Sequence, residues 1–376
     1  MKYPSMIGDP RIRLAILIAG LVPAFAIALT LVGRYKQQRQ NLGVMWAQRG
    51  ARDLAANPLL AVADYQTALS YRPDATADRL NLSEALIAAN HPEEAESHLL
   101  TLWAAEPGDG RINLDLARLS AAQEDITEAV RYYHAAIDGA WDVDAAVSRR
   151  NARLELAKLL LDRGQAVRAQ AELIALIDDL PSDPALTTEV GRLLVSAGAD
   201  ARAVGLFQRA LQLDPHDSQA ALLEGEVQFR AGQYAAARQM LAQASKEGAP
   251  MTASDQMMLD ESTRVPALDP LALHLSTRER ARRALQDLSI ARDRLARCAP
   301  PPSQAGDAQH VADLSRRADD MAKLRQRQLE RDPDQVDQMA ALVFEIEALP
   351  AQTCGPLSND DRALQLIAAE RRAQVR

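Results

Sequence analysis

The stretch "LLAVADYQTALSYRP", residues 59–73, places small and large side chains at fixed intervals. Ala61 is followed by Tyr65 four residues later, by Ala68 after three more and by Pro73 after a further five. Residues three and four apart lie on one face of a helix, so a small, an aromatic and a second small side chain share one packing face. Because proline cannot continue a helix, Pro73 predicts the end of this one.

The same set of small and large residues recurs along the chain. Its leading alanines lie 34, 34, 40, 34 and 34 residues apart, at Ala61, Ala95, Ala129, Ala169, Ala203 and Ala237. The interval of 40 contains an insertion of six residues around "WDVDAAVSRR", where Trp141 takes the place of the proline. A period of this length is typical of repeat architectures, in which each unit buries its apolar face by stacking on the next.

A second pattern precedes the leading alanines. It reads Leu82-Ser83, Leu116-Ala117, Leu156-Ala157, Val190-Gly191 and Glu224-Gly225. The turns between the two patterns contain Gly164, Gly198 and Gly232. Each unit is therefore predicted to be two antiparallel helices that approach each other closely at the alanines and glycines. Glu224 departs from the pattern because it is charged where the other units are apolar.

This arrangement resembles the tetratricopeptide repeat (TPR), in six units over residues 42–250. The resemblance implies an all-α fold, with an α-solenoid of six helix pairs in which the first helix of each pair lines a concave groove. It also implies that the chain binds protein partners in this groove. The composition agrees with an all-α fold, since aromatic residues make up only 4% of the chain while hydrophobic residues make up 48%.

The TPR register places matching residues of five units in the groove. One groove position holds Leu80, Leu114, Leu154, Thr188 and Leu222. A second position, one turn further along, holds Glu84, Arg118, Lys158, Arg192 and Glu226. Three consecutive units thus offer a cation beside an apolar floor, which suits an extended peptide with acidic side chains or a carboxylate. A solvated charged face without a ligand is the alternative interpretation.

The N-terminal region contains an apolar segment. Residues 14–33, "LAILIAGLVPAFAIALTLVG", carry no charge and are long enough to cross a bilayer as one helix. Residues 1–13 are then a short tail. A cleaved signal peptide ending at the A-x-A site of Ala24 to Ala26 is an alternative, but the apolar run continues past that site to Val32. A buried helix of a soluble protein is a further alternative.

The region after Pro250 loses the 34-residue period. Residues 251–268 are predicted to be a polar connector, and residues 269–376 a small helical domain that resembles no family. Ser276 and Glu279 predict the start of its first helix, which runs to about Arg297. Periodic apolar residues predict two further helices, around 311–324 and 336–346, and a fourth runs from about Asp360. The proline-rich residues 299–309 are predicted to be a linker.

The two cysteines, Cys298 and Cys354, each follow a predicted helix and stand close to a proline. They have neither the spacing nor the histidine neighbours of a metal site. A disulfide that closes a loop of about 57 residues is the preferred interpretation, and it requires an oxidising compartment. Two unrelated buried thiols are the alternative.

Enzymatic and nucleic-acid functions find no support in the sequence. The net charge of −8 argues against nucleic acid as a partner. No phosphate-binding loop, metalloprotease motif or nucleophile elbow occurs, and the six histidines are scattered. We therefore expect no catalytic residue, no cofactor and no metal site.

The function predicted from these features is that of a membrane-tethered TPR scaffold, a subunit or assembly factor of a bacterial membrane or envelope complex. We expect a single-pass protein of the bacterial inner membrane, held by residues 14–33, with its soluble part in the periplasm. A holdase-type chaperone for translocated proteins is the alternative. The C-terminal helices could also form an oligomer.

Overall fold

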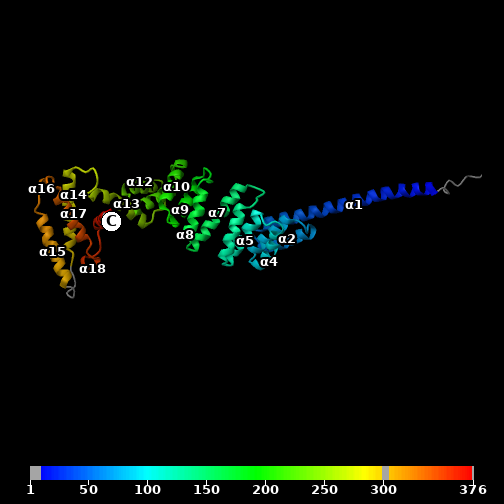
Figure 1. The fold of residues 1–376 in the computed structure, drawn as a ribbon, viewed down its shortest axis with the longest axis horizontal. Coiled ribbons are helices and arrows are strands. Elements are labelled where there is room, and N and C mark those ends of the chain that lie inside the picture. The colour runs from blue at the N-terminus through cyan, green and yellow to red at the C-terminus, as the bar shows by residue number, and fades with distance from the viewer. Residues whose placement is uncertain (1–9, 299–304, 375–376) are drawn as a thin grey trace, which may run out of the picture. The chain divides into compact units, whose positions relative to one another are not determined.

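The computed structural model describes residues 10–298 and 305–374. The chain divides into two compact units, unit 1 (Met1–Glu172) and unit 2 (Leu173–Arg376). Within the described residues the chain forms nineteen helices and no strand. Figure 1 shows the helical ribbon. The prediction of an all-α fold is confirmed.

Unit 1 begins with one long helix, α1 (Pro10–Asp53). By length and composition alone, α1 is apolar enough to cross a membrane, and its apolar side chains, such as Leu21 and Phe25, are exposed. The helix passes through Pro23 without interruption. Of the predicted tail, residues 1–9 lie outside the described residues, and the rest belongs to α1.

The C-terminal part of α1 is the first helix of the first repeat. It packs against α2 (Pro58–Tyr71), and the other helices of unit 1 follow in pairs (Figure 1). These are α3 (Thr76–Ala88), α4 (Pro92–Ala105), α5 (Gly110–Ala122), α6 (Ile126–Asp138) and α7 (Ala145–Asp162). α8 (Ala166–Ile177) contains the boundary between the two units, so the boundary does not coincide with the end of the repeats.

The repeat register predicted from the alanines agrees with the observed packing. All six leading alanines have no exposed surface, namely Ala61, Ala95, Ala129, Ala169, Ala203 and Ala237. The aromatic residues four positions on, Tyr65 and Phe207, are also buried. Burial of such residues contributes to stability in proportion to the apolar area removed from water, so these positions hold each helix pair together.

The turns inside the helix pairs use the left-handed backbone region. Gly164, Gly198 and Gly232 have φ of 69°, 75° and 73°, a conformation that suits glycine. The equivalent turns of the second and third repeats contain Asn90 and Glu124 at φ of 63° and 65°. The same turn is therefore kept in these two repeats without a glycine.

The six-residue insertion lies between α6 and α7. Trp141, which takes the place of the repeat proline, donates a hydrogen bond of 2.9 Å from its indole N–H to the carbonyl of Ala136. Part of the insertion lengthens the next helix, because α7 has 18 residues whereas α9 has 13. A side chain at Gly110 would collide with the ring of Trp141, so this glycine leaves room for it.

Unit 2 continues the repeats and then adds the C-terminal helices. The repeat helices are α9 (Pro184–Ser196), α10 (Asp200–Leu213), α11 (Ser218–Arg230) and α12 (Tyr234–Lys246). The later helices are α13 (Ala253–Leu268), α14 (Thr277–Leu295), α15 (Ala305–Met321), α16 (Gln326–Leu329), α17 (Pro333–Glu347), α18 (Ala351–Cys354) and α19 (Asn359–Gln374). Of the predicted linker, residues 299–304 lie outside the described residues, and the remainder is helical.

The predicted polar connector differs from the structure. Residues 253–268 form α13, and Thr252 begins this helix with a reciprocal capping box to Asp255. Val265 and Leu268 are buried in one apolar cluster with Tyr234 of α12 and with residues of α14, α17 and α19. The sequence of this segment looks polar because only one side of the helix carries apolar residues. That side packs between the last repeat and the C-terminal helices.

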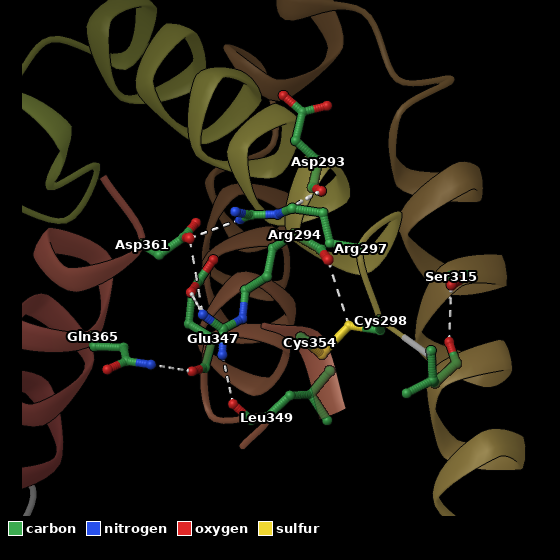
Figure 2. The surroundings of a disulfide bond; sticks show 11 residues. Asp293, Arg294, Arg297, Cys298, Ser315, Glu347, Leu349, Cys354, Asp361 and Gln365 are labelled. Atoms are coloured by element: carbon green, nitrogen blue, oxygen red, sulfur yellow. Dashed lines mark hydrogen bonds and ion pairs between the residues drawn. A yellow bond between two sulfur atoms is a disulfide. The ribbon is translucent and has the colours of Figure 1, made fainter. Parts of the chain in front are cut away.

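A disulfide links Cys298, just after α14, to Cys354, the last residue of α18 (Figure 2). Beside it lies a group of buried charges, which we call the Arg294 cluster: Arg294, Glu347 and Asp361. Arg294 is 1% exposed and donates a hydrogen bond of 2.5 Å to the carbonyl of Leu349. Its guanidinium lies 3.4 Å from the carboxylate of Glu347 and 3.9 Å from that of Asp361.

Gly191 offers a test of the repeat register. A Cβ atom at this position would lie 2.6 Å from Cε1 of Phe207. We expect Gly191→Val to lower the free energy of unfolding by about 1–3 kcal/mol through overpacking, measured by urea denaturation. Gly205→Ala in α10 is the control, since nothing lies within 4 Å of the added Cβ. The control should be neutral or slightly stabilising; equal effects of the two substitutions would contradict the register.

Candidate partner-binding groove

The groove positions predicted from the repeat register are mostly buried. Leu80, Leu114 and Leu222 are 5%, 7% and 5% exposed, and Thr188 is 6% exposed. Leu154 is half-buried. The expected apolar floor is therefore not an open surface, because Leu80, Leu114 and Leu222 pack into the apolar clusters of the repeats. The groove side chains that are exposed to solvent are mainly charged.

The predicted cation Arg118 belongs to an ion-pair network in unit 1. Its guanidinium donates two hydrogen bonds to Glu155 of α7, at 2.9 and 2.7 Å. It also lies 3.6 Å from Asp115 of its own helix. The Arg118 side chain is 47% exposed, so the pair joins neighbouring repeats and still faces solvent.

The pKa values of two groups in this network are raised above their ordinary values. Burial, followed by the repulsion of Glu84, raises the pKa of Asp115 to about 7. One carboxylate oxygen of Asp115 is buried without a hydrogen-bond partner. Burial and the charge of Glu155 raise the pKa of Tyr133 to about 12, and the Tyr133 hydroxyl lies 3.4 Å from that carboxylate. The charge of this part of the groove therefore changes near neutral pH, where Asp115 gains or loses its proton.

A second ion pair extends the network to the preceding repeat. Arg111 of α5 donates hydrogen bonds to Glu84 of α3, the shorter at 2.6 Å, and to the side-chain oxygen of Asn81 at 2.8 Å. Glu84 was predicted as a groove residue, whereas Arg111 and Asn81 were not. Lys158 of α7, another predicted cation, is exposed. The first helices of consecutive repeats in unit 1 are thus joined by charged pairs along the groove.

Unit 2 has its own part of the groove, a pocket of about 560 Å³ between α9, α11 and the turn that precedes α11. Arg192 lies in its wall and forms a bidentate pair with Glu189 of the same helix, the ion-pair distance being 2.8 Å. The Thr188 hydroxyl donates a hydrogen bond of 2.8 Å to Asp217. His216 also lines the pocket, and its ring lies 2.9 Å from Glu247.

The sequence contained a signal that shows why the cations are paired. An acidic residue stands three positions before each predicted cation, namely Asp115, Glu155 and Glu189 before Arg118, Lys158 and Arg192. Residues three apart share one face of a helix, so the acid and the cation of each repeat lie together. The groove was predicted from two positions of the repeat, and the acidic residues three positions before the cations belong to neither of them, so their pairing was missed. The expected row of free cations is a row of ion pairs at Arg118 and Arg192.

Among the described residues, no group of three or more histidine, cysteine, aspartate or glutamate side chains is placed to hold a metal ion. The ionisable groups described above form ion pairs and hydrogen bonds. The arrangement is suited to reversible binding of charged peptide side chains.

Comparison with protein families decides the class of this chain. Two tetratricopeptide repeat models match it, one at residues 55–113 and 194–250 and the other at residues 154–218. The chain therefore contains tetratricopeptide repeats at these residues. TPR proteins are generally scaffolds without enzymatic activity, and they bind protein partners in peptide-binding grooves. The matched segments lie inside the six repeats predicted from the sequence.

The chain is similar to several solved structures at low identity. One is the C-terminal part of a TPR protein from Cytophaga hutchinsonii, at 13% identity and a TM-score of 0.46, over 63% of this chain and 92% of that one. A second is PilW, a type IV pilus biogenesis factor, at 19% identity and a TM-score of 0.42, over 58% and 98%. A third is YrrB, described as having an unusual peptide-binding site, at 16% identity and a TM-score of 0.41, over 53% and 97%. No curated protein matches the chain by sequence.

Proposed function

We propose that this repeat protein is a non-enzymatic scaffold that holds a protein partner beside a bacterial inner membrane. The observation that carries the proposal is the continuity of α1, which joins an exposed apolar segment to the first repeat in one helix, Pro10–Asp53. A partner held in the repeats is then kept close to the membrane. The proposed membrane span is residues 14–33.

The groove favours a partner peptide that carries charges of both signs. Arg118 and Glu155 are 47% and 35% exposed, and Arg192 and Glu189 are 48% and 30% exposed. Each pair presents a cation and an acid side by side, so a bound peptide would align its own acids and bases against them. Such contacts are screened by salt, and retention of the partner is therefore expected to fall as ionic strength rises.

The periplasm is the proposed location of the repeats and the C-terminal helices. The Cys298–Cys354 disulfide supports an oxidising compartment, since such bonds are rare in the reducing cytosol. In this arrangement residues 1–13 remain on the cytoplasmic side. The proposed assembly is a membrane or envelope complex in which the chain is a subunit or assembly factor.

Purification of the tagged full-length protein from its native membranes, after light cross-linking and in mild detergent, tests the scaffold proposal. Mass spectrometry of the product should give one or two partners at a near-unit ratio. Many partners at low ratios, all of them translocated proteins, would instead support a holdase-type chaperone. A product without any partner would overturn both proposals.

The charge pattern of the groove gives a more specific test. We expect Arg118→Glu to reduce partner retention at least tenfold, because it places a second acid against Glu155 and removes the cation from the groove. The swapped variant Arg118→Glu with Glu155→Arg keeps an ion pair and reverses its direction, so it should fold normally and still fail to retain the partner.

The control is Arg131→Ala in α6. Arg131 forms an exposed pair with Glu128 of the same helix, outside the groove positions, and its loss should leave retention unchanged. If the swapped variant retains the partner as well as the native protein does, the ion pair is structural and the binding surface lies elsewhere.

A further inference from the structure

Glu224 occupies a position that is apolar in the preceding four repeats. The equivalent residues Leu82, Leu116, Leu156 and Val190 are at most 2% exposed. Glu224 is buried to the same degree, with 3% of its surface exposed. A buried carboxyl group costs free energy unless it is fully hydrogen-bonded or paired with a charge. Because Glu224 stands where the preceding repeats have an apolar residue, we expect its carboxyl group to have a hydrogen-bond donor or a cation as a partner.

Hydrogen-bond donors in the structure reach only one of the two oxygens of the Glu224 carboxyl group. One oxygen, Oε1, accepts a hydrogen bond of 2.7 Å from the amide of Gln228 and one of 3.2 Å from that of Gln208. The other oxygen, Oε2, is buried and has no partner, and the same holds for the side-chain oxygen of Gln228. Gln228 is 6% exposed. Two hydrogen-bond acceptors of neighbouring side chains thus have no donor.

These acceptors lie in the wall of a pocket of about 490 Å³ between α10, α11 and α12. Its lining includes five glutamines, and we call it the glutamine pocket: Gln208, Gln212, Gln228, Gln239 and Gln243. Gln208, Gln212 and Gln239 are exposed, whereas Glu224 and Gln228 are buried. The pocket shares no lining residue with the groove pocket of unit 2.

The charge of the pocket selects the kind of ligand. Among the described residues that line it, Glu224 is the only ionisable one, and no lysine or arginine is present. An anion would meet a carboxylate with no cation to balance it. A cation with several N–H donors would instead satisfy both Glu224 Oε2 and the oxygen of Gln228. The planar guanidinium of arginine has five such donors in a fixed fork.

We infer that the glutamine pocket is a second binding site of this protein, which takes the arginine side chain of a protein partner. The site is separate from the groove, so it does not depend on the groove contacts proposed above. A partner that fills both sites would be held from two sides of the same repeats.

One alternative explains Glu224 without a ligand. Burial raises the pKa of this carboxyl group, which favours its protonated form. A proton on Oε2 could then be donated to Gln228 and satisfy both open acceptors inside the protein. In that case the pocket would bind a guanidinium group no better than it binds a neutral molecule of the same shape.

A titration of the full-length protein in mild detergent distinguishes the two. Met240 lines the pocket, so its methyl group, labelled with carbon-13, is a local reporter among the nine methionines. The probe is n-butylguanidinium, and n-butylurea is the neutral compound of similar shape. We expect a saturable shift of the Met240 signal with n-butylguanidinium, and at least tenfold weaker binding of n-butylurea.

Two variants test the role of the carboxylate. Glu224→Gln keeps the shape and removes the charge, and we expect at least tenfold weaker binding of n-butylguanidinium. Asp200→Asn, on α10 but outside the pocket lining, removes an exposed carboxylate; it is the control and should bind as the native protein does. Equal affinities for the two probes, equal affinities of native and Glu224→Gln protein, or no shift of Met240 would each overturn the inference.

Discussion

Replacing Arg294 by methionine should lower the free energy of unfolding by about 3 kcal/mol at pH 8, measured by urea denaturation. Arg294 is 1% exposed, and its guanidinium lies within 4 Å of two buried carboxyl groups, Glu347 at 3.4 Å and Asp361 at 3.9 Å. Removal of the cation leaves Glu347 without a counter-charge in a site that excludes water, whereas Asp361 keeps its ion pair with Arg297 at 2.8 Å. It also removes the hydrogen bond to the carbonyl of Leu349.

The loss should be smaller at pH 6 than at pH 9, on the two sides of the native pKa of Glu347. Burial, followed by the charge of Asp361, already raises the pKa of Glu347 to about 8 in the native protein. Without Arg294, Glu347 is expected to hold its proton still more tightly in the folded state than in the unfolded state. Burial raises the pKa of Asp361, but hydrogen bonds from the Ser358 backbone and from Arg297 outweigh it and hold that pKa below its ordinary value. Stability from such groups is present at low pH and is lost as the pH rises through the folded-state pKa. A loss that did not grow with pH would contradict this account.

Two further variants isolate the buried charge. Arg292→Met in the same helix removes an exposed pair with Asp319, in which the side chains are 47% and 60% exposed, and should change stability by less than about 1 kcal/mol. The double variant Arg294→Met with Glu347→Leu should recover most of the loss, because it replaces a buried pair by apolar side chains. If the double variant is as unstable as Arg294→Met, lost packing rather than charge is the cause.

The repeat could be predicted from the sequence because its packing depends on local patterns. Ala61 and its equivalents fix where helices touch, and their spacing is visible without any tertiary information. The lengthened α7 could not be predicted in this way, since the insertion around Trp141 gives no sign of how it divides between turn and helix. The helical nature of residues 253–268 was missed because only a few positions, such as Val265 and Leu268, face the core.

The charged residues show the limit of sequence reasoning more clearly. Arg292, Arg294 and Arg297 lie within two turns of one another and look alike in the sequence. Only the packing of α17 and α19 against α14 buries Arg294 and leaves Arg292 at the surface. In the groove, by contrast, the acid three residues before Arg118 was visible. The contact of Arg118 with Asp115 could have been predicted from helix geometry alone, whereas its hydrogen bonds to Glu155 depend on the packing of α7 against α5.

Removal of the disulfide should lower the free energy of unfolding by about 4 kcal/mol. Cys298 and Cys354 are separated by 56 residues in sequence, and closure of a loop of this length restricts the unfolded chain by about that amount in the chain-entropy model. The variant Cys298→Ala with Cys354→Ala changes little volume at these positions. Urea denaturation of the variant and of the oxidised native protein gives the comparison.

Reduction of the native protein is the matched control for this variant. A reducing agent should bring the native protein to the stability of the double variant, and it should leave the variant itself unchanged. Equal stability of the variant and the oxidised native protein would show that the bond adds nothing to the free energy of unfolding.

Alkylation of the cysteines in native membranes tests in which compartment the C-terminal helices lie. A bond worth several kcal/mol stabilises the C-terminal helices only in an oxidising compartment, so fully alkylated cysteines would contradict the periplasmic proposal.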